Sequence, residues 1–212
     1  MNVKWLFFDI GNTIYDETEA DKDRVEALLS DNDYDITAEI FYDDMMDAAA
    51  AYAKSPFAAV RNKYGIEETT PYYADKEKLY PDVISTLEKL RMKYKIGVIA
   101  NQPSITYERL EKDGLIRYFD ICLLSETEGL EKPDREIFMR ALEQADCRPE
   151  DAVMIGDRLD NDIFPAKEIG FKTIWLRQGI SCKQEPVTDD YVPDREVSSF
   201  SELLDILKMN RI

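Results

Sequence analysis

The sequence predicts an α/β protein in which a mostly parallel sheet carries a small helical insertion after its first strand. Short runs of apolar and β-branched residues alternate with helical patterns in the later part of the chain, which is typical of βαβ units. Nearly ninety residues separate the first two of these runs, too many for a single crossover. The chain has 212 residues, 44% of them apolar, which is enough for a buried core plus a small insertion.

The first strand and the insertion are expected in the N-terminal part of the chain. Residues 3–8 form an apolar run and predict a strand. Residues 16–78, here called the helical insertion, include apolar residues at helical spacing: Phe41, Met45, Ala48, Ala49 and Tyr52. A second helix of the insertion should begin at Ser55-Pro56 and end at Gly65, because proline favours helix starts and glycine favours helix ends.

The rest of the chain is expected to complete the core. Residues 81–94 predict the crossover helix that returns from the insertion to the sheet. Four further strands are expected at residues 96–100, 120–124, 152–155 and 172–176. Further helices are expected at residues 104–113, 134–145, 160–169 and 201–208. The polar stretch 181–198 predicts a surface loop, so the core should comprise residues 1–15 and 79–212.

Composition excludes several classes of function. The net charge is −17, from 27 basic and 44 acidic residues, which disfavours nucleic acid and anionic membrane surfaces as partners. No apolar run approaches the ~18–20 residues of a membrane span. The chain has no histidine, which excludes Ser-His-Asp and Cys-His catalysis. Its three cysteines cannot all pair and none lies in a C-x-x-C motif, so a reducing, cytoplasmic setting is expected.

The acidic residues are concentrated in one segment. Residues 16–47 contain 13 acids and two bases. This run predicts a solvated outer face of the helical insertion, and the alternative is a surface that repels polyanionic substrates.

Two aspartates are expected at one edge of the sheet. Asp9 follows the first strand, and Asp157 follows the fourth. If those strands are neighbours, the two carboxylates could share one cation at the carboxyl edge, where such folds bind ligands. Carboxylates without histidine or thiolate specify Mg²⁺ rather than zinc. Asp162 could join them, although Asp160 and Asp162 could instead cap the following helix.

A third feature lies between the third and fourth predicted strands. Lys132 precedes Pro133 just before a predicted helix. From there its ammonium group could reach the sheet edge and neutralise a phosphate or a pair of carboxylates.

Together these motifs resemble the haloacid dehalogenase (HAD) superfamily, and the similarity extends along almost the whole chain. The resemblance is carried by Asp9-x-Gly-x-Thr13, Asn101 after the second strand, Lys132-Pro133, and Gly156-Asp157 followed by Asp162. The helical insertion between the first two motifs matches the C1-capped, phosphatase-like subfamily. The resemblance implies a Rossmann-like core with strand order 3-2-1-4-5, a mobile helical cap, and a small phosphorylated molecule as substrate.

The resemblance also implies roles for individual residues. Asp9 would be the nucleophile that forms an aspartyl-phosphate. Mg²⁺ would be held by Asp9, by the backbone carbonyl of Gly11 and by Asp157, with Asp162 supporting that shell and Lys132. Lys132 would assist catalysis and, with Asn101, would bind the phosphate.

Two positions depart from the family pattern. Gly11 stands where a second aspartate usually serves as general acid and base, and Ala100 stands where a hydroxyl usually contacts the phosphate. A missing general acid costs on the order of 10²–10⁴ in rate. The expected phosphatase is therefore slow, its proton must come from water or from a carboxylate of the insertion, and aryl or acyl phosphates should react faster than alkyl phosphates.

Two alternatives to the phosphohydrolase follow from the same residues. The joint departure at Gly11 and Ala100 suits a catalytically weak HAD-fold protein that binds a phosphorylated ligand or a partner. A dehalogenase-like hydrolase also lacks the second aspartate, but Asp157 makes a metal site that such chemistry does not need. Specificity would lie with residues of the insertion that face the site, and the candidates are Tyr15, Asp16, Lys54, Arg61 and Tyr72. The sequence favours no particular oligomeric state.

Overall fold

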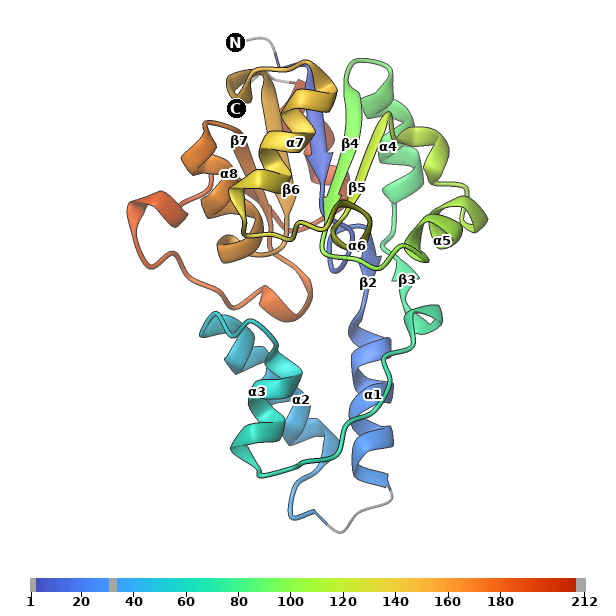
Figure 1. Ribbon diagram of the computed structural model, residues 1–212, viewed down its shortest axis with the longest axis vertical. Coiled ribbons are helices and arrows are strands. Elements are labelled where there is room, and N and C mark those ends of the chain that lie inside the picture. Colours follow the sequence, from blue (N-terminus) through green and yellow to red (C-terminus); the bar gives the residue numbers. More distant parts are fainter. Residues whose placement is uncertain (1–2, 31–33, 209–212) are drawn as a thin grey trace.

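The computed structural model of the protein describes residues 3–30 and 34–208. Figure 1 shows a sheet flanked by helices at one end of the molecule and a group of helices at the other. Along the sequence, the chain passes from the first part to the second and returns before it reaches most strands of the sheet. This arrangement matches the α/β class that the sequence predicts.

The central sheet is parallel throughout, and its strands lie in the order β5-β4-β1-β6-β7-β8 within the described residues. Its strands are β1 (Trp5–Phe8), β4 (Lys95–Ala100), β5 (Ile121–Leu124), β6 (Ala152–Gly156), β7 (Lys172–Leu176) and β8 (Arg195–Val197). The first five confirm the predicted order 3-2-1-4-5. Because the order reverses beside β1, the ends of β1 and β6 lie next to each other.

The prediction of a surface loop over residues 181–198 is wrong at its end. β8 lies in this stretch and extends the sheet beyond β7, with Val197 paired to Leu176. Its three residues include two exposed charged side chains, and only Val197 is buried. So short and polar a strand leaves no periodic apolar signal in the sequence.

Helices cover both faces of the sheet. They are α4 (Val83–Arg91), α5 (Thr106–Lys112), α6 (Ser125–Glu128), α7 (Arg135–Ala145), α8 (Phe164–Ile169) and α9 (Leu203–Lys208). Short turns of helix lie between these elements: η2 (Ile116–Tyr118), η3 (Pro149–Asp151), η4 (Leu159–Ile163), η5 (Gly179–Ser181), η6 (Asp189–Tyr191) and η7 (Phe200–Glu202). One more, η1 (Ala74–Lys76), lies in the helical insertion and contacts α1 (Thr18–Ser30). The predicted helix 160–169 is thus divided between η4 and α8.

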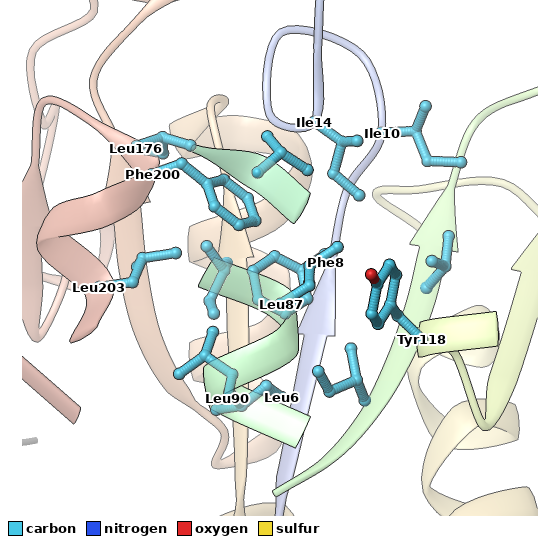
Figure 2. Packing of buried hydrophobic residues seen from close by; sticks show 14 of the residues in the cluster. Leu6, Phe8, Ile10, Ile14, Leu87, Leu90, Tyr118, Leu176, Phe200 and Leu203 are labelled. Carbon is cyan, nitrogen blue, oxygen red and sulfur yellow. The ribbon is translucent and has the colours of Figure 1, made fainter. Parts of the chain in front are cut away.

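Alternation along β1 divides the core into two layers, because successive side chains of a strand point to opposite faces. Leu6 and Phe8 pack on one face with Leu87 of α4 and Leu203 of α9 (Figure 2). Phe7 packs on the other face in a separate cluster beneath α7 and α8. With both faces covered, the edge where the strands end is the accessible part of β1 and β6.

The helical insertion has a hydrophobic cluster of its own. It contains α1 (Thr18–Ser30), α2 (Ala38–Ala50) and α3 (Pro56–Lys63), with the side-chain oxygens of Thr37 and Ser55 capping the last two. Its buried apolar residues are Val25, Leu28, Phe41, Met45, Phe57, Val60 and Ile66. The chain enters and leaves through a two-stranded antiparallel ribbon of β2 (Tyr15–Asp16) and β3 (Lys78–Leu79).

The first predicted helix of the insertion ends before Tyr52, so the prediction that it includes this residue is wrong. The apolar spacing continues α2 to this residue, but α2 ends at Ala50, and Tyr52 has a positive φ of 64°. Its ring packs against Tyr191 in a cluster of the core, and its hydroxyl donates to the carbonyl of Glu185, 2.6 Å away. Tyr52 therefore contacts the core rather than the cluster of the insertion.

Gln184 forms a second link between the two parts. Its side chain is fully buried, accepts from the amide of Leu159 (2.8 Å) and donates to the carbonyl of Ala49 at the end of α2 (3.1 Å).

No helix within the described residues is long and apolar enough to cross a lipid bilayer.

Candidate active site

Asp9 and Asp157 lie side by side, where β1 and β6 end. Phe8 pairs with Ile155, and the amide of Asp9 donates to the carbonyl of Ile155 across 2.9 Å. Carboxylate oxygens of Asp9, Asp157 and Asp162 lie within 4.8 Å of one another. The parallel register therefore brings together the aspartates that the sequence placed at separate strand ends.

Lys132 lies between two of these carboxylates. Its ammonium nitrogen is 2.6 Å from Oδ1 of Asp9 and 2.6 Å from Oδ1 of Asp162, and the residue is only 3% exposed. Burial alone would lower the pKa of the Lys132 ammonium group, but Asp162 and Asp9 outweigh burial and raise that pKa above its ordinary value. The lysine therefore remains charged.

Asn101 fixes the main chain of Lys132. Its side-chain oxygen accepts from the amide of Lys132 (2.7 Å), and its Nδ2 donates to the carbonyl of the same residue (2.8 Å). An amide NH₂ group has two donors. Asn101 can therefore hold the lysine segment and still offer one N–H to a ligand.

Both carboxylate oxygens of Asp162 accept hydrogen bonds. Oδ1 pairs with Lys132, and Oδ2 accepts from the amide of Arg158 (3.0 Å). Burial raises the pKa of Asp162 to about 6, while Lys132 opposes the shift. Asp160 lies apart from this group, because its carboxylate pairs with the Arg158 guanidinium at 2.7 Å.

The site holds more negative charge than Lys132 can neutralise. Asp157 is 3% exposed, and burial together with Asp162 and Asp9 raises the pKa of its carboxyl group well above the ordinary value. Buried carboxylates at such short distances repel one another unless a cation neutralises them. The oxygen-only donor set around Asp9 and Asp157 fits a hard divalent cation.

Glu17 is a residue of the site that the sequence analysis did not single out. Its carboxyl group fills the space beside Gly11: a Cβ added to Gly11 would lie 2.3 Å from Oε1 of Glu17. Asn12 donates to Oε2 of Glu17 across 2.9 Å. Burial, helped by Glu77 and Asp21, raises the pKa of Glu17 well above its ordinary value.

A cavity of about 270 Å³ lies over these residues, between the core and the helical insertion. The core contributes Asp9, Lys132 and Asp157, among others, and the insertion contributes Asp21, Arg24 and Tyr72. Of the five specificity candidates proposed from the sequence, Lys54 and Tyr72 line this cavity. The guanidinium of Arg24 lies 3.8 Å from the ring centre of Phe57, where its Nε donates to the carbonyl of Thr70.

The fold and this site define a class of protein: doubly wound α/β proteins that bind their ligand at the carboxyl edge of the sheet, where the strand order reverses. The family model of the haloacid dehalogenase-like hydrolases matches residues 6–176. The chain belongs to this family.

Several similar proteins are named as phosphatases. A glyceraldehyde 3-phosphate phosphatase of Methanopyrus kandleri is 31% identical over 97% of this chain and 97% of its own length. The protein of the same name from Methanocaldococcus jannaschii is 32% identical, also over 97% of both chains. A magnesium-bound HAD-hydrolase of Bacillus subtilis has the same fold, with a TM-score of 0.76, 22% identity, and coverage of 98% of this chain and 99% of that one. The protein is thus a phosphohydrolase of the HAD type.

Proposed function

We propose that this protein is a Mg²⁺-dependent phosphohydrolase that acts on a small phosphorylated metabolite through a phosphorylated Asp9. The observation that carries the proposal is the position of Asp9: its carboxylate lies at the end of β1, 2.6 Å from Lys132, and lines the cavity beneath the helical insertion. A carboxylate fixed in this way suits nucleophilic attack on phosphorus.

Asp9, the Gly11 carbonyl and Asp157 would hold the metal. The close carboxylates and their excess negative charge support this assignment, as does the magnesium-bound relative of the same fold. When bound, Mg²⁺ would reduce the repulsion between the Asp9 carboxylate and the incoming phosphate.

The other residues of the site would orient Asp9 and the phosphate and stabilise the negative charge of the phosphate. Lys132 holds Asp9 and would neutralise charge on the equatorial phosphate oxygens as Asp9 attacks. Asp162 fixes the lysine from its other side, and the remaining N–H of Asn101 would donate to the phosphate. Ala100 offers no hydroxyl there, and one lost hydrogen bond to a charged group costs roughly 1.5–3 kcal/mol. We therefore expect slower turnover than in a family member with the hydroxyl.

The helical insertion, residues 16–78, would act as a mobile cap. The ribbon of β2 and β3 would be its hinge, and closure would exclude water from the reacting groups. The cavity of about 270 Å³ suits a small substrate. The relatives named glyceraldehyde 3-phosphate phosphatases favour a sugar or triose phosphate.

Turnover of a panel of small phosphate esters, with Mg²⁺ and with excess chelator, tests this function. We expect phosphate release that needs the metal and disappears in Asp9→Asn. The matched control is Asp160→Asn, which removes a carboxylate near the site that pairs with Arg158 instead. Binding of a phosphorylated ligand without release of phosphate would instead support the alternative of a non-catalytic binding protein.

A further inference from the structure

The space left by Gly11 is already occupied by another carboxyl group. Oε1 of Glu17 lies 2.3 Å and its Cδ 2.8 Å from the place where a Cβ on Gly11 would stand. Gly11 itself does not have a positive φ, so its backbone conformation does not require glycine. A side chain at position 11 would displace the carboxyl group of Glu17 from this space.

The position of Glu17 is fixed by Asn12. Nδ2 of Asn12 donates to Oε2 of Glu17, and the carbonyl of Asn12 accepts from the side chain of Gln178, each across 2.9 Å. Asn12 is 5% exposed and packs against Gly179, where an added Cβ would lie 2.4 Å from its Oδ1. The buried amide therefore holds one carboxyl oxygen of Glu17 and leaves Oε1 on the side of Gly11.

We propose that Glu17, contributed from the start of the helical insertion, is the general acid and base of the reaction, in place of a side chain at position 11. This inference rests on the proposed phosphohydrolase function. In the first step an Asp9 oxygen bonds to phosphorus, the bond to the leaving oxygen breaks, and the Glu17 proton moves to that oxygen and releases an alcohol. In the second step water attacks the phosphorus of phosphorylated Asp9 and Glu17 takes a proton from the water. The bond from phosphorus to the Asp9 oxygen breaks, which releases phosphate and restores the Asp9 carboxylate.

Other carboxyl groups that line the cavity are worse placed for this role. Asp162 already binds Lys132 and the amide of Arg158 through its two oxygens. Asp157 lies beside Asp9 in the group that would hold the cation. Asp21, one helical turn further along α1, is the remaining competitor and enters the experiment as such.

The experiment compares leaving groups in the full-length protein with Mg²⁺. A departing alkoxide is a much stronger base than p-nitrophenolate, so it needs a proton far more as it leaves. We expect Glu17→Gln to lower kcat/KM for glycerol phosphate by on the order of 10²–10³ and for p-nitrophenyl phosphate by less than about tenfold. In the unmodified protein, the strong preference for aryl esters that glycine at position 11 predicts should be absent.

Three further variants make the test specific. Glu19→Gln removes a carboxylate from the first turn of α1, where it pairs with Lys78 at the surface, and should leave both rates unchanged. Asp21→Asn should not change the ratio of the two rates. Gly11→Asp combined with Glu17→Ala moves the carboxyl group to position 11, with room for it, and should recover part of the rate on glycerol phosphate.

Calorimetry of Mg²⁺ binding supplies a readout apart from turnover. Glu17→Gln should change the Mg²⁺ affinity by less than about threefold, because Glu17 is assigned to the proton and not to the metal. A loss of affinity as large as the loss of rate would overturn the inference. The melting temperature shows whether Glu17→Gln folds. If it does not, the rates on the two esters are compared instead in Glu17→Asp and in the double variant that combines Gly11→Asp with Glu17→Ala.

The outcomes separate this inference from the proposed function. Equal losses on both esters, or a leaving-group effect of Asp21→Asn alone, would overturn the role of Glu17. Asp9-dependent hydrolysis that Glu17→Gln does not slow would overturn only this inference. No turnover of any ester by the unmodified protein would overturn both.

Discussion

Asp157 is the residue whose replacement best separates metal binding from folding. Asp157→Asn keeps the shape of the side chain and removes one of three mutually repelling carboxylates. We expect this variant to remain folded without metal, to lose Mg²⁺ binding and to lose turnover. In the unmodified protein, Mg²⁺ at 100 times its Kd should stabilise the fold by about 2.7 kcal/mol.

Thermal unfolding with and without Mg²⁺ measures this difference. For a chain of this size the expected increase in melting temperature is roughly 5–10 °C in the unmodified protein. It should be absent in Asp157→Asn. An equal increase in both proteins would mean that the cation binds elsewhere.

Asp21 links the stability of the protein to pH. Burial raises its pKa to about 7, Glu77 and Asp16 add to the shift, and Arg24 opposes it. An unfolded aspartate has a pKa of about 4, so the folded state binds the extra proton between roughly pH 4 and 7. The free energy of unfolding should therefore fall as pH rises through this window.

Asp21→Asn removes the part of this pH dependence that Asp21 contributes, and leaves the part due to other buried carboxyl groups such as Glu17. We expect the variant to be more stable than the unmodified protein at pH 8, by on the order of 4 kcal/mol, because about three pKa units separate the folded from the unfolded aspartate. At pH 4 the two proteins should have similar stability. Urea unfolding at the two pH values, without metal, provides the measurement. A difference that is the same at both pH values would show that Asp21 does not titrate in this range.

The residues of the site were predictable to different degrees. Asp9 and Asp157 each follow an apolar strand, and parallel strands end at one edge, so their approach follows from the sequence pattern. Glu17 could not be found in this way, since its contact with Gly11 depends on a turn in which Asn12 has a φ of 50°. In the sequence Glu17 is one acid among 13 in a run that also fits a solvated surface.

At the scale of elements, Gln184 fastens α2 to the core. Removing its side chain would leave the buried amide of Leu159 without its acceptor, and an unsatisfied buried group costs about 1–3 kcal/mol. We expect Gln184→Ala to lower the free energy of unfolding by that amount and to speed hydrogen exchange at the end of α2. The comparison is Lys183→Ala, which breaks only an exposed ion pair with Asp47 and should cost under about 1 kcal/mol. Similar losses in the two variants would contradict the anchoring role.

The elements themselves were predictable where their apolar pattern was strong. The first five strands of the sheet are apolar runs, and their order follows the family resemblance. β8 and the end of α2 were not predictable, because both depend on tertiary contacts. β8 is held by its pairing with β7, and Tyr52 leaves the helical path to pack on Tyr191.

At the scale of the whole molecule, an exposed ion pair spans the two parts. Lys54 of the insertion lies 2.9 Å from Glu131 of the core. If the insertion must open for substrate to enter, joining these positions by Lys54→Cys and Glu131→Cys with a short bismaleimide should reduce turnover at least tenfold. Cross-linking is checked by electrophoretic mobility, and each single variant treated with the same reagent is the control. Full activity in the cross-linked protein would show that opening is not required.

The place of Glu17 in the chain gives the proposed reaction a built-in order. Asp9, Lys132 and Asp157 belong to the core, whereas Glu17 directly follows the ribbon and begins the segment that would swing. With Glu17 as proton donor, a swing that admits substrate also withdraws the donor from Asp9. In the open state, phosphorylated Asp9 would be exposed to bulk water but would lack Glu17, the base that activates the water. Hydrolysis would then require closure with a water molecule enclosed in the site. Ligand exchange would then occur with the hinge open, and both chemical steps would occur only with the hinge closed.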